Sequence, residues 1–281
     1  MLIANGFDGA RDVRRLLLGH RGFGNARPCG SAGPLIVLLC FLAAPAAAGP
    51  PYVTDDPEPV PHQHWEVYLA SLLSRDAGVW SGTAPHVEVN YGAARNLQLH
   101  TILPMSFVRS TEGTTTYGYG DTELGAKFRF IQETSTRPQV GTFPLLEIPT
   151  GDHHRGLGSG HVQLFLPVWL QKSYGDWLTY GGGGYWINPG AGNHDWGFFG
   201  WQVQRQLVSN LNLGAEVFHT TVQAQGGEAE TRINLGLVLD LSDLQHVLFS
   251  AGRGLEGPNQ FQSYLAYQLT FGPATQRRTG H

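Results

Sequence analysis

Cysteine, lysine and long apolar runs are scarce in this 281-residue chain. Both cysteines, Cys29 and Cys40, lie within the first 48 residues. Disulfides and thiolate chemistry are therefore excluded for the rest of the chain. No stretch after residue 48 holds the roughly 20 consecutive apolar residues of a membrane-spanning helix. Lysine occurs only at Lys127 and Lys172.

The charge balance argues against a nucleic-acid partner. The chain has 18 Lys and Arg residues and 22 Asp and Glu residues. Five of the basic and two of the acidic residues lie in the first 48, so the remainder has a formal net charge of −7. Neutralising phosphates requires clustered Lys or Arg, which an acidic, lysine-poor chain does not supply.

The first 48 residues have the organisation of a secretory signal. Arginines precede an apolar run from Pro34 to Ala44, and the small residues Ala46 to Ala48 offer a cleavage site before Gly49. The apolar run is too short to span a bilayer as a helix. We predict that residues 1–48 are removed on export.

Between Trp65 and Phe271, twelve segments alternate polar and apolar residues, the period of a β-strand. The cleanest segment sets Ile233 and Leu235 against Arg232 and Asn234. The seventh segment contains Gly181 to Gly184, over which aromatic rings of a neighbouring strand can pack.

The connections between these segments alternate in predicted length. Five are short: 92–96, 133–137, 172–176, 208–210 and 242–243. Six are longer: 75–81, 109–117, 150–159, 188–195, 223–230 and 254–259. Outer-membrane barrels have an even strand number, tight periplasmic turns and longer external loops. The fold class is therefore all-β: a single transmembrane antiparallel β-barrel of about 12 strands over 64–272, with a C-terminal tail at 273–281.

Period two alone does not distinguish this barrel from a soluble one with its apolar face inward. Compensating charges on the polar faces favour a wet lumen. Aromatic residues at the ends of the apolar faces favour interfacial girdles; they are Trp65, Tyr91, Phe107, Phe128, Phe130, Tyr267 and Phe271. Both features predict apolar side chains facing lipid.

A proline-rich lead-in, 49–63, precedes the first strand. Its acidic residues Asp55, Asp56 and Glu58 could contact the barrel mouth or bind a cation. A solvated turn is the simpler interpretation, and it is the one that we predict. A lead-in that plugs or gates the periplasmic mouth of the barrel is the alternative.

Three motifs resemble a known family. They are Thr54-Asp-Asp-Pro57, the segment Gly118 to Phe130 (GYGDTELGAKFRF), and Ile148-Pro-Thr-Gly-Asp152 followed by Gly156 to Gly160. In order and spacing they resemble the outer-membrane family named for the meta-pathway of phenol degradation. The resemblance covers most of the chain after the signal. It implies a barrel and solute passage, and it supplies no catalytic residues.

The candidate site is the inner face of the barrel. Asp121, Glu123, Lys127 and Arg129 alternate onto one face of one strand, either as a charged pore lining or as a ladder of ion pairs that closes the lumen. Phe165 and Trp169 form an apolar patch for aromatic solutes or fill a narrow barrel. The other predicted lumen-lining residues are His86, Glu88, His100, Glu147, Gln163, Glu216 and Arg232.

No metal, cofactor or catalytic site is predicted. Asp152, His153, His154 and His161 surround one loop, but adjacent histidines in a glycine-rich loop rarely converge on one ion. A serine hydrolase of the outer-membrane phospholipase type is an alternative. No strand places a serine and a histidine where mutual hydrogen bonding can be argued.

These observations predict an outer-membrane channel, and not an enzyme, for passive or facilitated passage of small organic solutes, with aromatic or hydrophobic ones included. The expected partners are the lipid bilayer with its lipopolysaccharide, the barrel-assembly machinery, and a small-molecule solute. The alternatives are a closed structural barrel without transport and a barrel-type membrane hydrolase.

Overall fold

The computed structural model describes residues 49–273. The predicted signal at 1–48 and residues 274–281 of the predicted tail lie outside this range. The strands are β1 (Trp65–Asp76), β2 (Val79–Ala94), β3 (Leu97–Arg109), β4 (Thr115–Tyr119), β5 (Thr122–Ile131), β6 (Gln139–Thr142), β7 (Leu145–Ile148), β8 (Gln163–Tyr174), β9 (Trp177–Ile187), β10 (Trp196–Val208), β11 (Leu211–Thr220), β12 (Glu230–Ser242), β13 (Gln245–Glu256) and β14 (Phe261–Phe271). Among the described residues, no helix is long and apolar enough to cross a bilayer.

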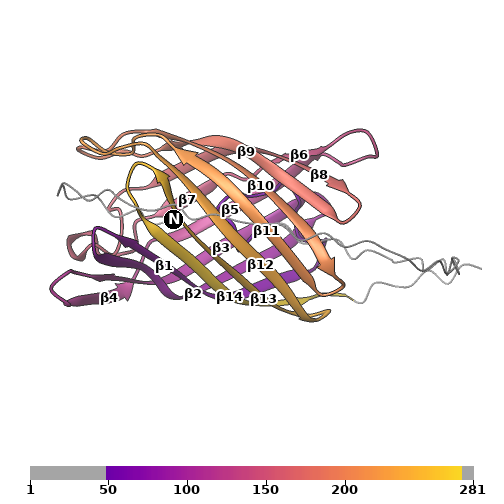
Figure 1. Cartoon of the computed structure of the whole chain (residues 1–281), viewed down its shortest axis with the longest axis horizontal. Coiled ribbons are helices and arrows are strands. Elements are labelled where there is room, and N and C mark those ends of the chain that lie inside the picture. The colour runs from indigo at the N-terminus through magenta and orange to yellow at the C-terminus, as the bar shows by residue number, and fades with distance from the viewer. Residues whose placement is uncertain (1–48, 274–281) are drawn as a thin grey trace, which may run out of the picture. The chain divides into compact units, whose positions relative to one another are not determined.

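The strands form one closed antiparallel barrel (Figure 1). Strands β4 and β5 both pair with β3 and are two parts of one strand. Strands β6 and β7 both lie between β5 and β8, interrupted at Phe143 and Pro144. The first strand pairs with the last from Trp65↔Phe271 to Arg75↔Phe261. The barrel therefore has the twelve strands that the sequence predicts, and closure leaves no unpaired edge.

The connections differ in part from the prediction. Only Ala77 and Gly78 separate β1 from β2, so the predicted long loop at 75–81 is wrong. Both residues have positive φ, 44° and 87°, as a tight hairpin turn requires. The connection between β5 and β6 spans 132–138 and is longer than predicted. The longest connection, 149–162, contains a 3₁₀ helix, η1 (His153–Arg155).

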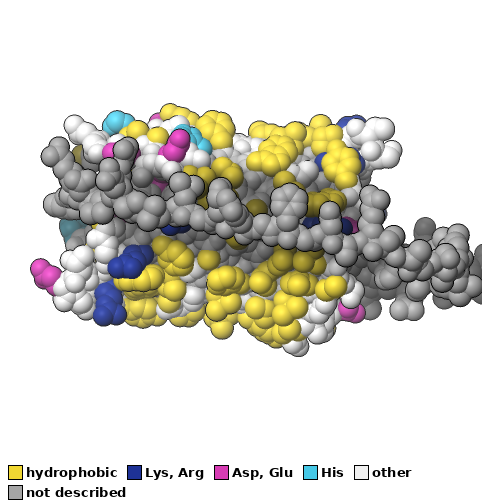
Figure 2. Space-filling view, in the orientation of Figure 1, with side chains coloured by type: hydrophobic (Ala, Val, Ile, Leu, Met, Phe, Trp, Pro, Cys, Tyr) yellow, Lys and Arg dark blue, Asp and Glu magenta, His cyan; other side chains and the backbone are white. Residues whose placement is uncertain are grey.

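Burial along the strands confirms that polar side chains face inward. On β12, Leu235 is 63% exposed whereas its neighbour Asn234 is 2% exposed. Charged and amide side chains such as Arg232, Gln202 and Glu216 are among the most buried in the protein. The visible outer surface between the two barrel ends is mainly hydrophobic (Figure 2). Such an inverted arrangement is the one that a lipid environment favours.

Two outward aromatic rows bound this apolar surface on neighbouring strands. Trp65 contacts the rings of Tyr91 and Phe271, with centroid distances of 4.3 and 6.5 Å. Towards the other end, the rings of Trp80 and Phe261 lie 6.3 Å apart. A strand advances roughly 33 Å from Phe261 to Phe271. Because strands of such barrels tilt by about 40° from the barrel axis, this is about 25 Å along the axis. This spacing matches the apolar band of an outer-membrane barrel.

The glycine run of β9 makes room for rings on both faces of the sheet. A Cβ atom at Gly181 would overlap the ring of Trp201 on the outer face. On the inner face, a Cβ atom at Gly184 would lie 2.6 Å from the ring of Phe165. The aromatic packing predicted over this run is therefore present.

Replacing Leu235 by Arg should lower the free energy of unfolding in a bilayer by about 2–4 kcal/mol, because this side chain faces outward near mid-strand. Urea unfolding in lipid vesicles measures the change. The matched variant Leu241→Arg, near the end of the same strand, should cost about 0–1 kcal/mol. Equal costs at the two positions would contradict a lipid-facing surface.

Candidate functional site: a lumen that holds the lead-in

The lead-in runs inside the barrel instead of lying in solvent. Thr54 and Asp56 are fully buried. The backbone N–H groups of Val53 and Thr54 donate to the two carboxylate oxygens of Glu216 on β11, at 2.9 and 2.8 Å. Further along, the N–H of Val60 donates to Gln98 Oε1 on β3 at 2.9 Å. The lead-in is therefore fixed at several points to the inner wall.

Ion pairs join the acidic residues of the lead-in to β5. Lys127 Nζ lies 2.9 Å from Asp55 Oδ1 and 3.2 Å from Asp56 Oδ2. Two residues further along the same face of β5, Arg129 Nη1 lies 3.5 Å from Glu58 Oε1. The amides of Gln139 and Gln171 donate to the other oxygen of Glu58, at 3.0 and 2.9 Å.

Glycines on the inner face provide space for the lead-in. A Cβ atom at Gly214 or Gly236 would overlap or crowd the ring of Tyr52, and one at Gly200 would overlap the hydroxyl of Thr54. Each glycine lies on a different neighbouring strand, β10, β11 or β12. The wall of the barrel is thus shaped to the segment that it encloses.

Two predictions are corrected by this arrangement. The solvated turn predicted for Asp55, Asp56 and Glu58 is wrong, since these residues are held by Lys127 and Arg129. The ladder of ion pairs predicted along β5 is also wrong. Its two cations pair with the lead-in, while Glu123 bonds to His100 and Asp121 bonds to the 149–162 connection.

The cluster contains more carboxylates than cations. Three acids, Asp55, Asp56 and Glu58, face Lys127 and Arg129. Burial, together with the neighbouring carboxylates, raises the pKa of Asp56 to about 8, against the opposing attraction of Lys127. Docking of the lead-in therefore favours the protonated form of Asp56.

Asp121 binds a loop and not the lumen. It lies at the break between β4 and β5, and its Oδ1 accepts the N–H of Gly151 at 2.9 Å. Its Oδ2 accepts both the N–H and the hydroxyl of Ser159, at 2.6 and 2.8 Å. The predicted pore lining is incorrect for this residue, because its carboxylate fixes the 149–162 connection to the barrel rim.

A hydrogen-bonded network on the inner face joins β2, β3 and β5. His100 bonds through Nδ1 to Asn90 Oδ1 at 2.7 Å and through Nε2 to Glu123 Oε1 at 2.9 Å. Asn90 donates in turn to Glu88 at 2.9 Å. The register places Glu123, Glu147 and Gln163 opposite one another on three adjacent strands.

The remaining predicted charges form separate groups. Arg232 on β12 donates three hydrogen bonds to Glu230, one of 2.9 Å from Nε and two of 2.6 Å from Nη2, and a fourth to Gln262 at 3.0 Å. Glu216 binds the lead-in and accepts a further hydrogen bond from Asn234. His86 bonds to Thr83 at 2.6 Å. The structure therefore divides the predicted set into several local networks on β2, β3, β5, β11 and β12.

A cluster of aromatic rings covers part of the inner face between β6 and β11. Phe165 and Trp169 on β8 belong to a buried cluster that contains seven members; the other five are Phe143, Trp186, Trp196, Phe198 and Phe218. The rings of Phe165 and Trp186 are stacked with centroids 4.9 Å apart. Val53 of the lead-in packs against this cluster. The indole N–H of Trp169 is buried and donates to no described residue.

The sequence identified two of these seven rings. The period-two pattern places Trp186, Trp196 and Phe198 in strands but does not show that they share a wall. The signal in the sequence is the alternation itself: Trp186 falls on the same face of its strand as Gly182 and Gly184, and that face points inward.

Metal and nucleophile sites are not assembled by the described residues. In that range no group of three His, Cys, Asp or Glu side chains could hold a metal ion. The rings of His153 and His154 stack on one another at 3.9 Å, and Asp152 caps η1. No hydrogen bond joins a serine side chain to a histidine side chain within residues 49–273.

Comparisons with solved structures give the fold a context. The COG4313 outer-membrane channel of Pseudomonas putida F1 is similar with a TM-score of 0.64 and 17% identity, over 77% of this chain and 98% of that one. The KdgM porin in complex with disordered oligogalacturonate gives 0.50 and 8%, over 73% and 99%. The NanC porin gives 0.50 and 7%, over 72% and 98%. No protein-family model and no curated protein matches the sequence. The chain therefore has the fold of outer-membrane channels and porins.

Replacing Lys127 by Ala should loosen the lead-in, because it removes the cation that both Asp55 and Asp56 contact. Since the barrel and lead-in contain no cysteine, Val53→Cys is a specific reporter. Its labelling by a water-soluble maleimide should accelerate in the Lys127→Ala background. The Lys172→Ala background, which breaks the partly buried pair with Glu133, is the matched control. Equal labelling rates in the two backgrounds would refute the conclusion that Lys127 holds the lead-in in the lumen.

Docking of the lead-in should weaken as pH rises. Docking raises the pKa of Asp56 from 3.8 to about 8. Between these pH values the docked state therefore binds one more proton than the undocked state, and docking weakens as the pH rises towards 8. Asp56→Asn mimics the protonated form. The ratio of Val53→Cys labelling rates, native Asp56 over Asp56→Asn, should rise between pH 6 and pH 9. A constant ratio would exclude Asp56 as the titrating group.

Proposed function

We propose that this protein is an outer-membrane channel for small organic solutes whose lumen is closed by its own lead-in. The observation that carries the proposal is the combination of a buried polar inner wall with a segment held against it by reversible, non-covalent bonds. The apolar outer surface supports placement in a membrane. A channel needs binding that is strong enough to admit a solute and weak enough to release it.

The aromatic inner wall supports a preference for aromatic or apolar organic solutes. Stacked and edge-on rings bind other π-systems, and a buried indole N–H adds one polar contact. The resemblance to the meta-pathway family points in the same direction. Val53 would leave part of this wall when the lead-in moves, and a solute of similar polarity would take its place.

A closed structural barrel without transport is the second candidate. The fit of the lead-in to inner-face glycines favours it, because a fixed filling would be shaped in the same way. The hydrolase alternative receives less support, since residues 49–273 provide no serine–histidine pair for nucleophilic catalysis.

Deletion of residues 50–60 should convert a low-conductance protein into an open one in planar bilayers. Removing this segment vacates the lumen without changing a strand. The charge reversal Lys127→Glu, which repels Asp55 and Asp56, should raise the open fraction in the full-length chain. In vesicles, the deletion variant should pass a small aromatic solute faster than a sugar of equal size.

Lys172→Glu is the matched control for charge reversal and should leave the conductance unchanged. If both open variants fold into the bilayer and still give neither current nor solute flux, the closed structural barrel is the correct description.

A further inference from the structure

Five side chains form a continuous outward row at the end of the barrel that carries the β1–β2 hairpin. Directly opposed residues of adjacent strands share one face of a sheet. The register opposes Arg253 to Phe261, Phe261 to Arg75, Arg75 to Trp80, and Trp80 to Arg109. The row thus alternates arginine and aromatic residues over β13, β14, β1, β2 and β3.

The row lies at the level of lipid headgroups. Its aromatic members, Trp80 and Phe261, form the aromatic row nearer the β1–β2 hairpin, about 25 Å along the barrel axis from the row at Trp65. The arginines between them are placed where the apolar surface ends. A guanidinium at this level meets the charged part of the lipid and not its acyl chains.

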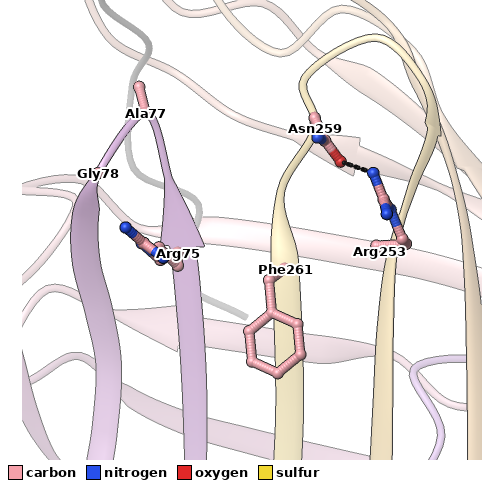
Figure 3. Close-up of a pocket in the computed structure, with 6 residues that line it drawn as sticks. All are labelled: Arg75, Ala77, Gly78, Arg253, Asn259 and Phe261. Atoms are coloured by element: carbon pink, nitrogen blue, oxygen red, sulfur yellow. Dashed lines mark hydrogen bonds between the residues drawn. The ribbon is translucent and has the colours of Figure 1, made fainter. Parts of the chain in front are cut away.

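The three guanidinium groups have no carboxylate partner among residues 49–273. Arg75 lies over the ring of Trp80, 5.5 Å from its centroid. Arg253 donates to Asn259 at 2.9 Å. Arg75 and Arg253 flank the strand of Phe261 and line a shallow pocket with it (Figure 3). Most of their donors are therefore free for a ligand.

The next outward row, towards the middle of the barrel, is uncharged and consists mainly of small residues. Its members are Ala251, Ser263, Leu73, Gly82 and Phe107. Small side chains below a row of arginines leave space for acyl chains that descend from a headgroup.

We propose that this row binds lipopolysaccharide, a phosphorylated glycolipid of the outer leaflet, through its phosphates. The proposal rests on the proposed function for its orientation, with the hairpin end outside. Arginine binds phosphate through paired donors. Neighbouring arginines of the row are separated by two strand spacings, roughly 10 Å. Two phosphates on one glycolipid therefore engage more of the row than a single phosphate does.

Arg205 supplies a matched control at the opposite end of the barrel. It also faces outward and lies over an aromatic ring, 5.3 Å from the centroid of Trp177. Its register partners are Trp177 and Leu213, so no second arginine accompanies it. It reproduces the local chemistry of one arginine without the row.

The experiment is a lipid titration of the detergent-purified barrel with its lead-in, followed by native mass spectrometry. The probes are bisphosphorylated lipid A, its monophosphorylated form and phosphatidylglycerol. The bisphosphorylated form should bind tightest. Arg75→Gln/Arg109→Gln/Arg253→Gln should weaken it by about a hundredfold, on the order of fivefold per arginine, and Arg205→Gln should leave it unchanged.

Equal binding of the three probes, or equal loss in Arg205→Gln, would overturn the proposal. If the triple variant does not fold, Arg75→Gln and Arg253→Gln separately test the expected fivefold steps. Conductance tests the channel separately from lipid binding. The triple variant is combined with the lead-in deletion. If this protein conducts but no longer binds lipid A, both the channel and the lipid-binding role of the arginine row are supported. A lead-in deletion variant that folds and binds lipid A but does not conduct refutes only the channel.

Discussion

Closure of the sheet between β1 and β14 makes every other feature of this barrel possible. A strand in lipid has no water to satisfy its backbone groups, so every strand needs two neighbours. The pairing of Trp65 with Phe271 and its continuation to Arg75 supply the last neighbour. Closure also separates two environments. Alternate side chains must then face either lipid or an enclosed lumen, and a shift of one residue would exchange the two sets.

The enclosed lumen creates a second requirement, since buried charges need partners. Lys127 and Arg129 face inward from β5 and are satisfied by Asp55, Asp56 and Glu58 of the lead-in. Removing either side would leave the other buried without a counter-charge. The lead-in is consequently part of the charge balance of the barrel. A segment held by ion pairs and hydrogen bonds can be released by a change in charge.

The aromatic part of the inner face depends on β9. Its glycines remove side chains, so rings from β8 and β10 pack closely over the bare backbone on both faces. The polar wall from β1 to β5 carries instead the network centred on His100. A solute in the lumen would contact hydrogen-bonding groups on one side and π-faces on the other. On the outside, the same register aligns arginines and aromatics into a row that no single strand contains.

The strands, their number and the residues that alternate together can be predicted from the sequence, because a period of two and turn residues are local signals. Tertiary structure decided the partners. Nothing local indicates that Asp55 meets Lys127, 72 positions away, or that Asp121 leaves the lumen to bind Ser159. The tight turn at Ala77 and Gly78 was missed because strand length beyond the membrane depends on pairing with neighbours. Contacts between distant residues follow from barrel closure and register, which only the folded chain specifies.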